Sequence, residues 1–93
     1  MASYFITGAS RGFGLALARE LAFLPAADVS KIYATARGDA FNLEELAKQS
    51  SRRVIVVKLD VTNQASISQA AADVKANLEG KGLDILINNA GIC

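Results

Sequence analysis

A glycine-rich segment follows the first apolar run of this chain and reads Thr7-Gly8-Ala9-Ser10-Arg11-Gly12-Phe13-Gly14. The apolar run before it, Tyr4-Phe5-Ile6, is typical of a short buried strand. The segment from Gly12 to about Leu24 repeats apolar residues at helical spacing (Phe13, Leu17, Leu21, Leu24), and Pro25 follows as a helix stop. The chain therefore begins with a strand, a glycine loop and a helix.

The spacing of these glycines is G-x-x-x-G-x-G, and each has a physical role in binding a phosphate group. Gly8 permits a tight turn, Gly12 lets the backbone approach a pyrophosphate, and Gly14 lets the helix pack closely on the strand. Unpaired N–H groups at the helix start then face the anion. The alternative is a strand-to-helix turn without a ligand. A P-loop is excluded because Gly-Lys-Ser/Thr is missing and Gly14-Leu15-Ala16 stands instead.

The rest of the chain continues the alternation of strands and helices. Further strands are expected at residues 31–36, 54–57 and 83–87, and helices at about 43–48 and 65–78. The third strand is β-branched and apolar on both faces, which is typical of a parallel strand between two helix layers. The last helix carries an apolar stripe of Ile67, Ala71, Val74 and Leu78. The order βαβαβαβ predicts an α/β fold with a parallel sheet.

The composition excludes several classes of function. A chain of 93 residues holds one small domain, and its net charge of +1 without a basic stripe is untypical of a general nucleic-acid binder. The absence of His excludes Ser-His-carboxylate and Cys-His chemistry and the commonest metal ligand, so we expect no metal site. We expect no membrane segment and a cytoplasmic location, since no apolar run is long enough and Cys93 is the single cysteine. The pair Arg52-Arg53 is expected on a solvated strand edge.

Three motifs together resemble those of the short-chain dehydrogenase/reductase family. The glycine segment matches TGxxxGxG, Asn88-Asn89-Ala90-Gly91 matches NNAG, and Asp60 falls where the family keeps an adenine-contacting Asp. Each motif lies at the C-terminal end of an expected strand, where open α/β sheets bind ligands. The resemblance covers all 93 residues. It implies a Rossmann-like doubly wound parallel sheet, incomplete and limited to its N-terminal part, with residues 1–93 as a partial NAD(P)-binding domain.

The resemblance also implies a role for individual residues in binding a nicotinamide dinucleotide. Asp60 would accept a hydrogen bond from the adenine amino group, Val61 would lie beside the ring, and Asn89 would contact the adjacent ribose. Asn88 is expected to tie neighbouring strands together. The pyrophosphate and the adenosine ribose would be lined by Gly8, Ser10, Arg11, Gly12, Phe13 and Gly14.

The end of the second strand favours NADP(H) over NAD(H). NAD-selective sites usually carry an Asp or Glu here, whereas this chain has Ala36 followed by Arg37. Arg11 supplies a second cation, and a planar guanidinium suits a 2′-phosphate. Alternatively, both arginines are ordinary solvated charges, or Asp39 pairs with Arg37. The string Thr35-Ala36-Arg37 and the segment 24–28 look like the carbonyl-reductase and sniffer-like branch of the family.

No catalytic residue can be assigned in this chain. Members of the family transfer a hydride between nicotinamide and a carbonyl or alcohol, with a Ser and a Tyr-x-x-x-Lys pair that follow the NNAG motif. Here Tyr4 is followed four residues later by Gly8, and Tyr33 by Arg37.

We therefore expect the N-terminal part of an NADP(H)-dependent short-chain oxidoreductase, inactive as 93 residues alone, whose small carbonyl or alcohol substrate needs a full-length form. The alternative is a non-catalytic module that binds a nucleotide or a partner. A Tyr-x-x-x-Lys pair further along the reading frame would favour the oxidoreductase. A stop codon with a stable protein would favour the module.

The fourth strand is expected at an edge of the sheet. In the usual order 3-2-1-4, Ile85-Leu86-Ile87 would expose unpaired backbone and apolar side chains. A single helix, around residues 67–78, would cover its face of the sheet. We therefore predict that the isolated chain is poorly stable or self-associates through this strand.

Overall fold

A computed structural model describes residues 2–10, 12–25, 29–38, 40–60, 62–79 and 82–87. Within these ranges strands and helices alternate as expected, which confirms the α/β fold. The elements are β1 (Ala2–Ile6), α1 (Gly12–Ala22), β2 (Val29–Ala36), α2 (Phe41–Gln49), β3 (Val54–Lys58), α3 (Gln64–Leu78) and β4 (Ile85–Ile87).

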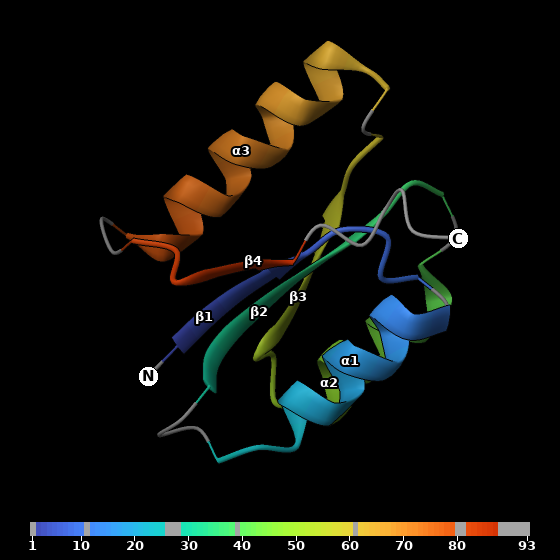
Figure 1. Cartoon of the computed structure of the whole chain (residues 1–93), viewed down its shortest axis with the longest axis vertical. Coiled ribbons are helices and arrows are strands. Elements are labelled where there is room, and N and C mark those ends of the chain that lie inside the picture. The colour runs from blue at the N-terminus through green and yellow to red at the C-terminus, as the bar shows by residue number, and fades with distance from the viewer. Residues whose placement is uncertain are drawn as a thin grey trace.

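All four strands lie in one parallel sheet in the order β3-β2-β1-β4, as predicted. In the register, Phe5 of β1 lies opposite Tyr33 of β2 and Leu86 of β4. Helices α1 and α2 lie together on one face of the sheet and α3 lies on the other (Figure 1). Because the strands are parallel, their carboxyl ends meet at one edge, and this edge carries the glycine loop, Arg37 and Asp60.

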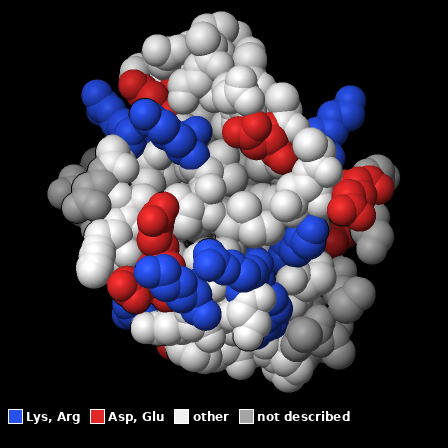
Figure 2. Space-filling view, turned by 180° about the vertical axis from the view of Figure 1, so that it is seen from behind, with Lys and Arg blue, Asp and Glu red and all other residues white. Residues whose placement is uncertain are grey.

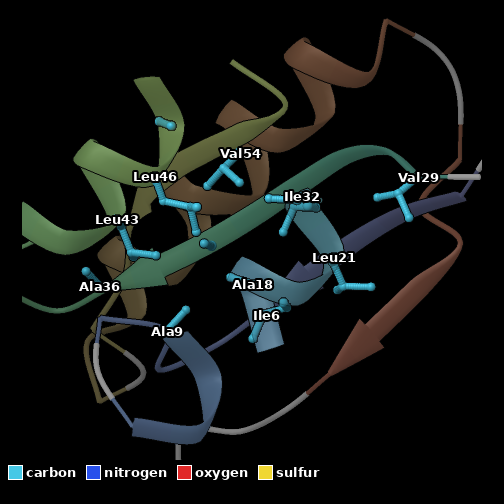
Figure 3. Packing of buried hydrophobic residues seen from close by; sticks show 13 residues of the cluster. Ile6, Ala9, Ala18, Leu21, Val29, Ile32, Ala36, Leu43, Leu46 and Val54 are labelled. Carbon is cyan, nitrogen blue, oxygen red and sulfur yellow. The ribbon is translucent and has the colours of Figure 1, made fainter. Parts of the chain in front are cut away.

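The core beneath α1 and α2 combines isoleucine, valine and alanine residues of the strands with leucine and alanine residues of the two helices (Figure 3). Helix α1 buries Gly14, Ala18, Leu21 and Ala22. Of the apolar residues that recur at helical spacing, Phe13 and Leu24 are 69% and 43% exposed. Gly14 and Ala18, four residues apart, lie on the buried side of α1. The helix ends at Ala22, and the N–H groups of Phe23 and Leu24 bond to carbonyls three residues back, which tightens the last turn.

On the opposite face, α3 packs on the sheet through Ala70 and Val74, which lie in one buried cluster with Tyr33 of β2. Two other members of its predicted stripe, Ile67 and Ala71, are exposed, which corrects that prediction. They line an open apolar groove of about 490 Å³ between α3 and β4. Phe5, Leu78, Leu83 and Leu86 also line the groove. These groove-lining residues come from β1, from α3 and from the region of β4, and β1 is far from the other two in the sequence. Helical periodicity alone therefore does not predict the groove.

Strand β4 lies at an edge of the sheet, as expected, and pairs with β1. The exposed fraction is 63% for Leu86 and 37% for Ile85. This part of the sheet therefore presents apolar side chains beside a strand edge, the combination that favours association of chains. Self-association itself stays a prediction.

Side-chain hydrogen bonds fasten helices α3 and α1 to the sheet. The ammonium of Lys31 donates to Asn77 Oδ1 at 2.8 Å and to its carbonyl at 3.0 Å, and the hydroxyl of Tyr33 donates to the same Oδ1 at 2.7 Å. Arg53 donates to the carbonyl of Val29 at 3.0 Å and to that of Ala22. Arg53 therefore caps the end of α1, which corrects the expectation that it lies on a solvated edge.

The surface carries charges of both signs. Figure 2 shows the face seen from behind, where basic and acidic side chains are interspersed on a largely uncharged surface. Within the described ranges, no helix has both the length and the apolar character needed to cross a membrane.

Candidate dinucleotide-binding site

The loop between β1 and α1 is held against the ends of two neighbouring strands. The N–H of Gly8 donates to Thr35 Oγ1 at 3.1 Å, and the N–H of Ala9 donates to the Thr35 carbonyl at 2.8 Å. The N–H of Thr7 donates to the carbonyl of Ile87 at 3.1 Å. Thr35 is almost fully buried near the end of β2. The loop is thus fixed before any ligand arrives, at the carboxyl edge of the sheet where ligands of open α/β sheets bind.

Two of the three predicted loop glycines have left-handed backbone. Gly8 and Gly12 both have φ of 63°, a conformation that costs a residue with a Cβ atom about 1 kcal/mol or more. A Cβ atom on Gly12 would meet no heavy atom within 4 Å, so the backbone there faces open space. Gly14 is buried where α1 packs on the sheet. The left-handed backbone of Gly8 and the burial of Gly14 are consistent with a tight turn and with close helix packing, and the approach of a pyrophosphate to Gly12 stays a prediction.

The other two described loop residues differ in exposure. Ser10 is half-buried, whereas the side chain of Phe13 is exposed. Phe13 is the second residue of α1, so its backbone N–H belongs to the first turn of the helix. Helix α1 begins at Gly12, and the first N–H groups of an α-helix have no partner within the helix. Such groups can bind an anion.

Arg37 and Asp60, predicted from separate motifs, lie next to each other. The Nε of Arg37 is 3.7 Å from Oδ2 of Asp60, and their side chains are 78% and 30% exposed. Arg37 follows directly after Ala36, the nearly fully buried last residue of β2. Asp39, the alternative partner suggested by the sequence, lies outside the described residues. An ion pair this exposed is weak, so Arg37 can exchange its partner for a stronger anion.

The carboxylate of Asp60 is held mainly by Thr62. Oδ1 of Asp60 accepts from the Thr62 hydroxyl at 2.6 Å and from the Thr62 N–H at 3.0 Å. These two hydrogen bonds, and to a lesser extent the charge of Arg37, lower the pKa of Asp60 below its ordinary value, while partial desolvation opposes them. Asp60 is therefore ionised at neutral pH.

The backbone of Asp60 is fixed by the start of α3. The N–H of Asp60 donates to Ser66 Oγ at 2.9 Å, and the N–H of Ser66 donates to Oδ1 of Asn63, the N-cap of α3, at 3.0 Å. Sequence reasoning missed Thr62, Asn63 and Ser66. The signals were present: Asp60 stands two residues before Thr62, the spacing of an Asx-type turn, and Asn63 immediately precedes a helix.

Arg11, Val61, Asn88 and Asn89 lie outside the described residues. Among the residues that are described, no three His, Cys, Asp or Glu side chains gather as metal ligands. Tyr33 is fully buried against Asn77, and burial, together with the charge of Glu79, raises its pKa, the opposite of what a proton donor requires.

A model of the short chain dehydrogenase family matches residues 3–93. This chain belongs to the short-chain dehydrogenase family. Eight of the curated proteins that it matches are 36–44% identical to it. The chain spans 19–34% of the lengths of these relatives.

Solved structures of short-chain dehydrogenases and reductases share the fold. The NADPH-bound carbonyl reductase from chicken fatty liver is 42% identical with a TM-score of 0.89, over 99% of this chain and 35% of that one. The carbonyl reductase Sniffer of Drosophila melanogaster is 36% identical with a TM-score of 0.87, over 100% of this chain and 38% of that one. The predicted likeness to the carbonyl-reductase branch is confirmed.

Other structures in the family are solved with a different cofactor. A 3-ketoacyl-(acyl-carrier-protein) reductase from Brucella melitensis, complexed with NADH, is 25% identical with a TM-score of 0.73, over 91% of this chain and 32% of that one. The family therefore binds nicotinamide dinucleotides, and the choice between NADP(H) and NAD(H) has to be argued from this chain's own residues.

Proposed function

We propose that this chain forms the adenosine and phosphate half of the cofactor site in an NADP(H)-dependent short-chain oxidoreductase that acts on a small carbonyl or alcohol. Residues 1–93 are then a partial NAD(P)-binding domain. The observation that carries the proposal is the position of Arg37, an exposed cation directly after the buried Ala36 at the carboxyl end of β2. An acidic residue in this part of the site would favour NAD(H), and a cation favours the 2′-phosphate of NADP(H). The NADPH bound to the similar chicken carbonyl reductase supports this choice.

Each part of the site has a separate task in this proposal. The N–H groups at the start of α1 bind the pyrophosphate, helped by the helix dipole and by the room above Gly12. Arg37 leaves its weak pair with Asp60 and binds the 2′-phosphate, because a phosphate carries more charge and accepts a bidentate contact. Asp60 accepts from the adenine amino group. The dinucleotide, when bound, exchanges a hydride with the substrate, and no proton donor is assigned among these 93 residues.

The substitution Arg37→Asp tests the choice of cofactor in the product of the complete reading frame. Losing a charge-assisted contact with phosphate should raise the Kd for NADPH by at least roughly tenfold, and the new carboxylate should accept from the ribose 2′-OH and favour NADH. Fluorescence titration with NADPH and NADH measures both constants.

Arg52→Asp is the matched control for this change of charge. Arg52 is equally an exposed arginine, but it lies in the turn before β3, at the opposite end of the sheet from the site. Asp also tolerates the left-handed backbone of Arg52, whose φ is 68°. This variant should bind NADPH like the original protein. An Arg37→Asp protein with unchanged NADPH affinity would contradict the proposal.

The apolar groove between α3 and β4 favours a second candidate function, a non-catalytic module that binds a partner. Exposed apolar surface of this kind marks an interaction site or a surface that more of the same fold would cover. A Tyr-x-x-x-Lys pair further along the reading frame would favour the oxidoreductase. We also propose a cytoplasmic location, which the single cysteine of the chain supports. Cell fractionation tests this location.

A further inference from the structure

Thr62 makes two hydrogen bonds to one oxygen of Asp60. Its hydroxyl lies 2.6 Å from Oδ1 and its backbone N–H lies 3.0 Å from the same atom. The other oxygen, Oδ2, faces the guanidinium of Arg37 at 3.7 Å, beyond hydrogen-bond distance. The carboxylate is therefore oriented by Thr62, and Oδ2 keeps its capacity to accept a hydrogen bond from a ligand.

The main chain beneath this carboxylate is fixed as well. The N–H of Leu59 donates to the carbonyl of Ala36 at 3.0 Å, and the N–H of Asp60 donates to Ser66 Oγ at 2.9 Å. These contacts tie Asp60 to β2 and to α3. With its backbone held from both sides, the remaining freedom of Asp60 lies in its side chain, and the Thr62 hydroxyl restricts that freedom.

We propose that Thr62 is a positioning residue that gives this site its preference for an adenine base. It holds the Asp60 carboxylate through Oδ1, so that Oδ2 can accept from the 6-amino group once Arg37 has moved to the 2′-phosphate. The inference rests on the proposed function, since it needs a dinucleotide in this site. Thr62 itself need not touch the ligand.

The chemistry of the base explains why orientation matters. Adenine carries an amino donor at position 6, whereas hypoxanthine carries a carbonyl oxygen there. An ionised carboxylate accepts from the amino group and repels the carbonyl oxygen. The same hydrogen bonds from Thr62 lower the pKa of Asp60, which keeps the carboxylate in the form that makes this distinction.

The variant Thr62→Val tests the proposal in the product of the complete reading frame. Valine keeps the shape and the backbone N–H of threonine but removes the hydroxyl that bonds to Oδ1. The measurement is the affinity for NADPH and for its hypoxanthine analogue, nicotinamide hypoxanthine dinucleotide phosphate. We expect the original protein to prefer NADPH by about tenfold or more, and Thr62→Val to reduce this ratio by roughly threefold or more.

Two further variants separate positioning from folding. Thr62→Ser retains the hydroxyl and should restore the ratio. Asn63→Ala removes the N-cap acceptor of α3, which weakens the same helix start, but leaves both bonds between Thr62 and Asp60. It should keep the ratio of the original protein even where its overall stability falls, because the ratio compares two ligands on one protein.

Each outcome tests either the positioning role of Thr62 or the proposed function. A Thr62→Val protein with the original ratio overturns the positioning role. An original protein that binds NADPH and its analogue equally well also overturns it, but leaves the proposed function standing. An original protein that binds neither dinucleotide overturns the proposed function, and this inference with it.

Discussion

The Nε of Arg37 lies 3.7 Å from Oδ2 of Asp60, so the first residue after β2 and the second residue after β3 share one charged site. The sequence motifs predicted different ligand contacts for these two residues, the 2′-phosphate for one and the adenine base for the other. Their closeness means that the cation and the carboxylate influence each other before a ligand binds. Both residues lie at the same carboxyl edge of the sheet as the glycine loop.

The first prediction concerns the titration of Asp60. Its pKa lies below the ordinary 3.8 mainly because of the hydrogen bonds from Thr62, with a smaller effect from Arg37. Thr62→Val should therefore raise the pKa of Asp60 more than Arg37→Ala does. Carbon-detected NMR titration of the side-chain carboxyl measures this. A larger change in Arg37→Ala would show that the ion pair, rather than Thr62, controls this group.

The sign of the associated pH effect follows from the same shift. Because the folded pKa of Asp60 is depressed, its ionised form stabilises the fold at every pH above the ordinary carboxyl range. That contribution is lost as the pH falls below about 4 and through the folded value. In the Thr62→Val protein, the free energy of unfolding should therefore fall less on acidification than in the original protein. Urea unfolding at a series of pH values measures this difference.

The second prediction concerns the open backbone at Gly12. Gly12→Ala should lower the free energy of unfolding by about 1 kcal/mol, because φ is 63°, without any steric clash. The new methyl group should weaken dinucleotide binding as well, because it occupies the space where a pyrophosphate approaches. Gly38→Ala is the matched control, since Gly38 has equally open space and no left-handed backbone. Unimpaired binding by the folded Gly12→Ala protein would count against this loop as the phosphate site.

The third prediction concerns the attachment of α3 to β2. Asn77→Ala removes the acceptor of the Tyr33 hydroxyl, which is buried, and the partner of the Lys31 ammonium. An unsatisfied buried hydroxyl should cost about 1–3 kcal/mol in urea denaturation. Tyr33→Phe should cost less, because it removes the hydroxyl itself and leaves the bond between Asn77 and Lys31. Equal stability of the Asn77→Ala protein and the original would mean that this contact does not hold α3.

The fourth prediction concerns the edge at β4. We expect the isolated 93-residue chain to be poorly stable or to self-associate, and Leu86→Lys to reduce association, because charged residues protect strand edges. Phe23→Lys is the control, since Phe23 is 67% exposed but follows α1 rather than lining the groove. Size-exclusion chromatography with light scattering reports the state. A monomer that unfolds cooperatively would refute the expectation.

Much of the fold could be predicted because it depends on local patterns. Apolar strands, glycine turns and helical periodicity predicted the order of elements, and the usual topology of such sheets predicted that β4 lies at an edge. The predictions failed where a side chain meets residues distant in sequence. Phe13 shares the helical spacing of the apolar residues but is exposed, whereas the small residues Gly14 and Ala18 are buried. Arg53 was assigned to solvent, yet it reaches the carbonyl of Val29.

In the candidate site, too, features that depend on local sequence could be predicted and features that depend on distant residues could not. The glycine spacing predicted the tight turn of the loop, because a turn depends on local backbone conformation, while the approach of a pyrophosphate to Gly12 stays a prediction. The pairing of Arg37 with Asp60 could not be predicted, since it depends on how closely the ends of β2 and β3 approach. The role of Thr62 was accessible from the spacing Asp60-x-Thr62, but that spacing identifies a turn and carries no information about a ligand.

The central claim, a site for a 2′-phosphorylated adenosine beside Arg37, is tested most directly with the smallest ligands that differ in that phosphate. Isothermal titration calorimetry of the product of the complete reading frame should show adenosine 2′,5′-bisphosphate binding at least roughly tenfold more tightly than adenosine 5′-monophosphate. Equal affinities for the two nucleotides, or no binding of the bisphosphate, would contradict the claim.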